Sequence, residues 1–265
     1  MDEDERLRRG ASFGAVAQAY AEHRPDYPEA AVRWCLAPAG APGAPGADLS
    51  LLRVVDLGAG TGKLTALLTR LGADVTAVDP DQAMLAELRR QLPEVRALPG
   101  SAEALPLADG SADAVLCGQA MHWFDMDVAL PEIARVLVAG GVLAGLWNSD
   151  DDRVDWVAGL QAVAKGTASP TLSARRAEAF DYDLDHVAPA LFTPADRAEF
   201  PNGQRRTAQS MVATIATHSR LLVMDPAGRD ELLAAVTAYL SERPETADGE
   251  FTVPIVTSAL RAVRR

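Results

Sequence analysis

A glycine-rich loop near position 58 constrains the fold of this chain more than any other feature. Residues 51–57 are almost continuously apolar, which is typical of a strand buried on both faces of a sheet. Gly58, Gly60 and Gly62 follow directly, and a segment with helical spacing runs over 62–71. Glycine lets the backbone turn sharply and approach a ligand closely, and the helix begins with free N–H groups. This order of elements predicts an α/β fold with a ligand site at the carboxyl end of the strand.

The alternation of strand and helix patterns continues after this loop. Further strands are expected at 74–78, 95–98, 112–117 and 141–147, and helices at 81–92 and 127–137. Such alternation favours right-handed βαβ units and a parallel sheet. The remaining expected elements are helices at 13–20, 29–36, 152–164, 173–179, 211–219 and 228–240, with strand patterns at 195–201 and 251–263.

Two other nucleotide-binding loops fit the glycine-rich segment less well. A phosphate-binding P-loop needs Gly at its first position and Ser or Thr at its last, where this chain has Leu57 and Leu64. The dinucleotide pattern Gly-x-Gly-x-x-Gly, counted from Gly58, would put its third glycine at Lys63. The pattern that remains is Asp-x-Gly-x-Gly-x-Gly, beginning at Asp56. An NAD-dependent oxidoreductase stays open as an alternative.

The Asp-x-Gly-x-Gly-x-Gly loop resembles the cofactor loop of class I S-adenosylmethionine (SAM)-dependent methyltransferases. Residues 100–107 (Gly-Ser-Ala-Glu-Ala-Leu-Pro-Leu) and 112–117 (Ala-Asp-Ala-Val-Leu-Cys) resemble the third segment and the fourth strand of that family. The resemblance covers about residues 12–147, with weaker matching over 253–264. It implies an α/β fold with a Rossmann-like, mostly parallel seven-stranded sheet, an N-terminal helical lid and a helical insertion after the fifth strand.

The resemblance also implies a division of the chain into four parts. We expect a lid and linker at 1–47, a SAM-binding core at 48–147, a substrate-binding insertion with a sixth strand at 148–245, and a terminal strand at 246–265. The Pro/Gly-rich stretch 37–48 separates the lid from the sheet.

Asp79 is the candidate ribose ligand. It lies 19 residues after Gly60, at the end of the strand 74–78, where a carboxylate can accept both ribose hydroxyls. The alternative is a helix N-cap, a role for which Asp81 is better placed. Met84, one turn into the next helix, packs against adenine or simply in the core.

The expected cofactor is SAM, with S-adenosylhomocysteine (SAH) as product and no metal. The residues that the resemblance assigns to the cofactor are Tyr20, Arg24, Asp56, Gly58, Ala59, Gly60, Asp79, Pro80, Met84, Ala102, Glu103, Cys117, Gln119 and His122, with Gly118 contributing backbone. The consecutive acids Asp150, Asp151 and Asp152 cannot all face one ion on a helix and are read as solvated surface.

The segment Gln119-Ala120-Met121-His122-Trp123-Phe124 follows the fourth expected strand, where open α/β sheets place their ligands. His122 is a candidate base near neutral pH, and Trp123 a candidate wall facing the sulfonium. The alternative is that His122 bonds the backbone and Trp123 fills the core.

A second motif, Phe13-x-x-x-Ala-x-x-Tyr20-x-x-x-Arg24-Pro-x-Tyr-Pro28, accompanies this segment. Together they resemble trans-aconitate carboxyl methyltransferases and thiol methyltransferases of dithiol natural products. The resemblance implies that Tyr20 covers the methyl centre and that Arg24 serves the methionine carboxylate or the acceptor. The candidate catalytic residues are then His122, Trp123 and Tyr20, and the candidate substrate-binding residues are Phe13, Trp123, Trp147 and His218.

Charge and composition exclude several other classes. The net charge is −12 with a pI near 4.8, which argues against nucleic-acid binding and against attachment to anionic membranes. The two cysteines provide neither a disulfide framework nor a Cys-based zinc site. No secretory signal and no run of 18 apolar residues is visible. We therefore expect a cytoplasmic protein, monomeric or weakly dimeric, that acts on a small molecule.

Among acceptors, a thiol is the preferred prediction, in natural-product or detoxification metabolism. A thiol has a pKa near 8.5 and is a strong nucleophile once ionised, so one modest base suffices. A carboxylate is already ionised at pH 7 and needs positioning cations instead. Carboxyl or hydroxyl O-methylation, and a non-catalytic SAM-binding protein, remain alternatives.

Overall fold

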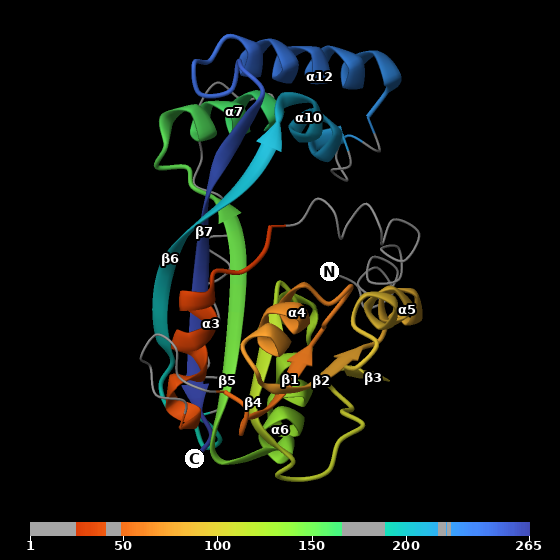
Figure 1. The fold of residues 1–265 in the computed structure, drawn as a ribbon, viewed down its shortest axis with the longest axis vertical. Coiled ribbons are helices and arrows are strands. Elements are labelled where there is room, and N and C mark those ends of the chain that lie inside the picture. The colour runs from red at the N-terminus through yellow and green to blue at the C-terminus, as the bar shows by residue number, and fades with distance from the viewer. Residues whose placement is uncertain (1–24, 41–48, 166–188, 217–220, 222–223) are drawn as a thin grey trace. The chain divides into compact units, whose positions relative to one another are not determined.

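The computed structural model describes residues 25–40, 49–165, 189–216, 221 and 224–265 (Figure 1). The expected helices at 13–20 and 173–179 lie outside the described residues. So do four candidate site residues, Phe13, Tyr20, Arg24 and His218. They stay predictions from the sequence.

The described strands form one seven-stranded sheet in the order β3-β2-β1-β4-β5-β7-β6 (Figure 1). The strands are β1 (Arg53–Leu57), β2 (Asp74–Asp79), β3 (Arg96–Pro99), β4 (Ala112–Gly118), β5 (Leu137–Asp150), β6 (Asp196–Thr207) and β7 (Glu250–Val263). β1 to β5 pair in parallel, and β7 is antiparallel. The predicted Rossmann-like, mostly parallel sheet is therefore confirmed.

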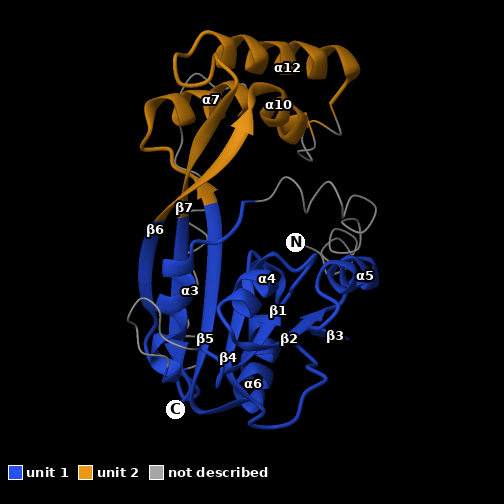
Figure 2. Ribbon diagram, viewed as in Figure 1, with its two compact units in different colours: residues 1–148, 178–200, 257–265 blue, residues 149–177, 201–256 orange. Residues whose placement is uncertain are grey.

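The chain divides into two compact units (Figure 2). The first comprises residues 1–148, 178–200 and 257–265, and the second comprises 149–177 and 201–256. The strands β5, β6 and β7 each contribute residues to both units. The two units are described separately below.

In the first unit, alternate residues of a strand face opposite helix layers. Val54 of β1 packs in a cluster with α3 (Glu29–Leu36) and α4 (Lys63–Arg70). Its neighbour Val55 packs in a second cluster with α6 (Met126–Val136). Since both faces are covered, both residues must be apolar, which explains the continuous apolar run in the sequence.

The helix α5 (Gln82–Gln91) follows β2 and packs through Leu88 against Ala77. Asp81 is its N-cap, because its Oδ1 accepts hydrogen bonds from the N–H groups of Ala83 at 2.8 Å and Met84 at 3.2 Å. The expected cap at Asp81 is confirmed, and Asp79 is left for another role.

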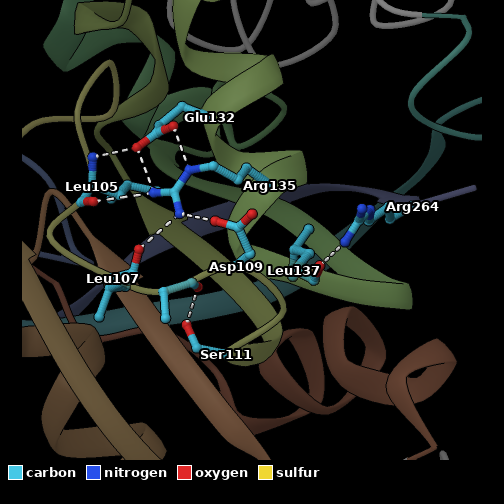
Figure 3. A network of polar contacts seen from close by, with 9 residues as sticks. Leu105, Leu107, Asp109, Ser111, Glu132, Arg135, Leu137 and Arg264 are labelled. Atoms are coloured by element: carbon cyan, nitrogen blue, oxygen red, sulfur yellow. Dashed lines mark hydrogen bonds and ion pairs between the residues drawn. The ribbon is translucent and has the colours of Figure 1, made fainter.

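Arg135 fastens the loop before β4 to α6 (Figure 3). Its guanidinium donates to the carboxylates of Glu132 and Asp109 and to the backbone carbonyls of Leu105 and Leu107. Glu132 Oε1 in turn accepts the Leu105 N–H at 2.8 Å. Arg135 thus supplies hydrogen-bond donors to backbone carbonyls of a loop that has little secondary structure of its own.

The second unit contains α7 (Asp155–Lys165), α10 (Ala208–Ala216) and α12 (Pro226–Ser241). Their apolar faces pack in a separate hydrophobic cluster with residues 251–255 of β7. In this cluster the rings of Trp156 and Phe251 are in edge-on contact. No helix in the described part of the chain is long and apolar enough to cross a bilayer.

Candidate functional site

A cavity opens in the first unit at the carboxyl ends of β1, β2 and β4. In the strand order 3-2-1-4-5 the connections change direction between β1 and β4, which is where ligands bind in open α/β sheets. The cavity is lined by Pro25, Tyr27, Asp56, Gly58, Ala59, Gly60, Thr61, Lys63, Leu64, Asp79, Pro80, Asp81, Met84, Gly118, Gln119, Ala120, Trp123, Phe124 and Asn148. The predicted glycine loop and the predicted segment after β4 therefore lie on two walls of one cavity.

Two glycines of the loop are required for different reasons. Gly58 has φ +72°, and a Cβ there would lie 2.5 Å from the Cβ of Ala120, so the backbone can pass only without a side chain. Gly60 has φ +56°, but a Cβ there would meet nothing within 4 Å. Glycine is needed at position 60 because the backbone is in the left-handed conformation, which other residues rarely adopt. The space beside it is open to a ligand.

Asp79 ends β2 and points to the glycine loop. Its Oδ2 accepts the Gly60 N–H at 2.8 Å, and its Oδ1 accepts the Asp81 N–H at 2.8 Å. The two backbone donors fix the orientation of the carboxylate. Each of its oxygens can still accept a further hydrogen bond from a ligand. Burial raises the pKa of Asp79, while the two backbone N–H groups oppose that shift.

Asp56 lies in β1 below the loop and is fully buried. The Thr65 hydroxyl donates to its Oδ2 at 2.5 Å, whereas Oδ1 has no hydrogen-bond partner in the described part of the chain. The pKa of Asp56 is raised to about 7: burial is the main cause, the Thr65 hydrogen bond opposes the shift, and the charge of Asp79 adds to it. A cation in the cavity would stabilise its ionised form.

Apolar side chains also line the cavity. Met84, in the first turn of α5, is buried, and Pro80, Leu64 and Phe124 also line the cavity. A lining that combines carboxylates with apolar side chains matches a ligand with a polar sugar and a flat, weakly polar base.

Gln119 follows β4 in an unusual backbone conformation. Its φ is +57°, and among the described residues it is the only non-glycine residue with a positive φ. Two hydrogen bonds to β5 hold it, from its N–H to the Leu146 carbonyl and from its Nε2 to the Asn148 carbonyl, both at 2.8 Å. This turn presents Gly118, Gln119 and Ala120 to the cavity.

His122 and Trp123 lie in a short 3₁₀ helix, Met121–Trp123, after this turn. Their ring centroids are 4.8 Å apart with the planes tilted by 46°. Trp123 lines the cavity, while His122 is exposed and does not belong to the cavity lining among the described residues. Of the predicted pair, Trp123 lies at the cavity, and the predicted roles of His122 stay predictions.

Besides His122, four predicted site residues of the described structure lie outside the cavity lining. Ala102, Cys117 and Trp147 are buried in the cluster beneath α6. Glu103 Oε1 accepts the Asp125 N–H at 2.9 Å, at the start of α6. None of the four lines the cavity in the described part of the chain, and their roles stay predictions.

Pro25 and Tyr27 line the cavity but are absent from the predicted site, and Asn148, which the sequence places beside Trp147 at the end of the fifth strand and at the border of the pocket, lines the cavity as well. Tyr27 covers Gly118 so closely that a Cβ on Gly118 would lie 2.6 Å from the Tyr27 hydroxyl. The signal for Asn148 was its polarity directly after an apolar strand, at the sheet edge where ligands bind. For Pro25 and Tyr27 the contacts join segments more than 90 residues apart in sequence, which local patterns do not show.

These residues fit SAM. Asp79 offers fixed oxygen acceptors for ribose hydroxyls, and the unpaired, buried Oδ1 of Asp56 offers an acceptor for a cationic group. Met84 and Pro80 offer an apolar surface for adenine. Within the described residues no three His, Cys, Asp or Glu side chains are grouped to hold a metal ion.

Comparisons with known proteins agree with this geometry. A family model described as a methyltransferase domain matches residues 55–145, the stretch that contains the glycine loop, Asp79 and the turn after β4. An uncharacterized methyltransferase of Mycobacterium tuberculosis is 39% identical over 253 residues, which cover 95% of this chain and 95% of that protein. An uncharacterized methyltransferase of Schizosaccharomyces pombe is 35% identical over 195 residues, 71% of this chain and 74% of that protein.

Other relatives match over about a third of the chain. The malonyl-[acyl-carrier protein] O-methyltransferase of Pectobacterium atrosepticum is 40% identical over 94 residues, 35% of this chain and 37% of that protein. Among solved structures, one assigned as a type II methyltransferase from Anaeromyxobacter dehalogenans is 27% identical. It superposes with a TM-score of 0.61 and covers 91% of this chain and 97% of that one.

Proposed function

The chain belongs to the class I SAM-dependent methyltransferases, and we propose that it methylates the sulfur of a small-molecule thiol. The membership rests on the relative that is 39% identical over 95% of the chain. The choice of a thiol rests on the charges of the cavity and on the His122–Trp123 ring pair, of which Trp123 lines the cavity.

The cavity is suited to a cationic ligand. Asp56, Asp79 and Asp81 line it, whereas Lys63 is the one Lys or Arg in its lining among the described residues. Lys63 is paired with Asp26, whose Oδ1 lies 2.8 Å from Nζ. Bound SAM supplies a methyl group on a sulfonium centre, which is an activated donor and needs no metal. Asp79, the Gly60 backbone and Asp56 would hold it.

The same charges disfavour a carboxylate acceptor. An anion placed in a cavity with three carboxylates needs positioning cations, and the cation in the described lining is already paired. A thiol is neutral until it loses its proton. It therefore enters such a cavity without the repulsion that an anion would meet.

His122 and Trp123 would serve the acceptor. His122 would take the proton from the thiol, since an imidazole titrates near neutral pH and the thiol pKa lies near 8.5. Trp123 and Phe124 would exclude water from the reacting atoms, because both present apolar surface to the cavity. The residues need to hold donor and acceptor in line, which is a positioning task.

O-Methylation is the second candidate, because the malonyl-[acyl-carrier protein] relative is an O-methyltransferase by name. That match spans 94 residues, 35% of this chain, so it supports O-methylation less strongly than a match over the whole chain would.

The test is a methyl-transfer screen with SAM labelled in its methyl group. Thiols are compared with carboxylic acids and phenols of matched size, at pH 7. We expect label in thiols, and we expect His122→Gln to lower the rate by about 100-fold at pH 7. The deficit should shrink as the pH approaches the thiol pKa, because the thiolate then forms without a base. Transfer of the labelled methyl group to carboxylic acids or phenols, and not to thiols, would overturn the proposal of S-methylation and favour O-methylation.

A further inference from the structure

Asn148 joins three separate segments of the first unit. It lies near the end of β5 and is almost fully buried. Its side-chain Nδ2 donates to the carbonyls of Pro25 and Asp26, both at 3.2 Å, and its Oδ1 accepts the Thr257 hydroxyl at 2.5 Å. Its backbone carbonyl accepts Gln119 Nε2 at 2.8 Å.

The orientation of the Asn148 amide follows from these partners. The carbonyls of Pro25 and Asp26 can only accept hydrogen bonds, so the NH₂ group must face them. The amide oxygen then faces Thr257, whose hydroxyl can donate. An Asp side chain at the same position would put an oxygen against two carbonyl oxygens, although its shape is nearly the same.

Two of the three segments that Asn148 joins, residues 25–27 and the turn at Gln119, line the cavity. Pro25 and Tyr27 line it, and Tyr27 lies over Gly118. We call residues 25–27 the Pro25–Tyr27 segment. It directly precedes α3, whose Pro28 N-cap makes no side-chain capping hydrogen bond. The two hydrogen bonds from Asn148 therefore fix the backbone of this segment at the point where it meets the sheet.

Resting on the proposed function, we propose that Asn148 is a positioning residue for the cofactor, which acts by fixing the Pro25–Tyr27 segment against the end of β4. Asn148 sets where Pro25 and Tyr27 lie, and these two residues close the cavity on the side of Gly118 and Gln119. Thr257 supports this role by fixing the orientation of the amide.

The experiment compares four variants by calorimetric titration with SAH and by hydrogen–deuterium exchange without ligand. Asn148→Asp reverses the polarity of the contact with Pro25 and Asp26. Thr257→Val removes the supporting hydroxyl, and Thr257→Ser keeps it. Asn202→Asp is the matched control, since it makes the same chemical change on β6 in the second unit.

We expect Asn148→Asp to weaken SAH binding by about tenfold and Thr257→Val by about threefold, because hydrogen bonds are lost or reversed. Thr257→Ser and Asn202→Asp should stay within about twofold of the unmodified protein. The peptide covering 25–36 should exchange faster in Asn148→Asp and Thr257→Val, while peptides of β1 and β2 keep their rates.

Two results would overturn the proposal. One is SAH affinity in Asn148→Asp within twofold of the unmodified protein. The other is weakened binding with unchanged exchange in 25–36, which would assign Asn148 a direct contact with the ligand. If Asn148→Asp does not fold, the Thr257→Val and Thr257→Ser pair decides by the same two criteria. If the unmodified protein does not bind SAH, the proposed function fails, and exchange in 25–36 still decides whether Asn148 holds the segment.

Discussion

The carboxylate of Asp79 accepts the backbone N–H of Gly60 at 2.8 Å, so the end of β2 is bonded directly to the glycine loop after β1. The second carboxylate oxygen accepts the Asp81 N–H at the start of α5. One acidic side chain thus sets the distance between the two loops that form the cofactor side of the cavity. The remaining lone pairs of the same carboxylate are then placed for a ligand.

Replacing Asp79 should weaken cofactor binding strongly. We expect Asp79→Ala to lower the affinity for SAH by about 100-fold, since hydrogen bonds to a charged acceptor contribute about 1.5–3 kcal/mol each. Asp79→Asn should lose about tenfold, because one of its two polar atoms no longer accepts. Calorimetric titration measures both. Asp74→Asn, at the exposed opposite end of β2, is the control, and equal losses in Asp74→Asn and Asp79→Asn would refute the role.

Asp56 should make the stability of the ligand-free protein depend on pH. Its pKa is about 7 in the folded protein against an ordinary value of 3.8, so the folded state binds the proton more tightly. The resulting stabilisation is fully present below pH 3.8 and is lost as the pH rises through about 7. Thermal unfolding at pH 5 and pH 8 should therefore show a larger drop for the unmodified protein than for Asp56→Asn. Equal drops would mean that Asp56 titrates normally.

The same carboxyl should make cofactor binding depend on pH in the opposite direction. A cationic ligand favours ionised Asp56, so SAM should bind more tightly as the pH rises from 6 to 8. In Asp56→Asn this dependence should largely disappear, because the amide does not titrate. Titrations at several pH values check it, and a pH dependence of the same size in both proteins would assign it to another group.

Gly118 should tolerate no side chain while Tyr27 lies over it. A Cβ there would come within 2.6 Å of the Tyr27 hydroxyl, so Gly118→Ala must displace the ring and open the cavity wall. We expect SAH affinity to fall by about tenfold, and Tyr27→Phe in the same background to recover part of the loss because the closest atom is removed. Undiminished affinity in Gly118→Ala would show that Tyr27 does not help to enclose the cofactor.

The Arg135 network in Figure 3 should contribute to stability and not to binding. Arg135→Met removes hydrogen bonds to two backbone carbonyls and two carboxylates, and we expect a loss of about 1–2 kcal/mol in the free energy of unfolding. Arg90→Met, which breaks one exposed pair with Glu87, should leave stability unchanged within error. Chemical denaturation compares the two, and SAH affinity should be the same in both.

The sheet and the cofactor side of the site could be predicted from the sequence because their signals are local. The apolar run before Gly58 and the acid 19 residues after Gly60 are both short-range features of a βα unit. Their positions in the structure follow from the parallel register of β1 and β2. The same reasoning placed the helix cap at Asp81 and left Asp79 for the ligand.

The rest of the site could not be predicted as well, because it depends on contacts between distant segments. The strand expected at 141–147 extends over Leu137–Asp150, and its polar end at Asn148 contacts Pro25, 123 residues earlier in the chain. Glu103 is assigned to the cofactor by resemblance alone, and the hydrogen bond that its Oε1 accepts from the N–H of Asp125 has no local signal in the sequence. Such pairings are decided by packing, and no periodicity in the sequence records them.

The most direct test of the account is a calorimetric titration of the unmodified protein with SAH and, separately, with NADH. The carboxylates and glycines around the cavity predict saturable binding of one SAH per chain, and no heat from NADH beyond dilution. Binding of NADH without binding of SAH would contradict the account and return the glycine loop to the dinucleotide-binding class.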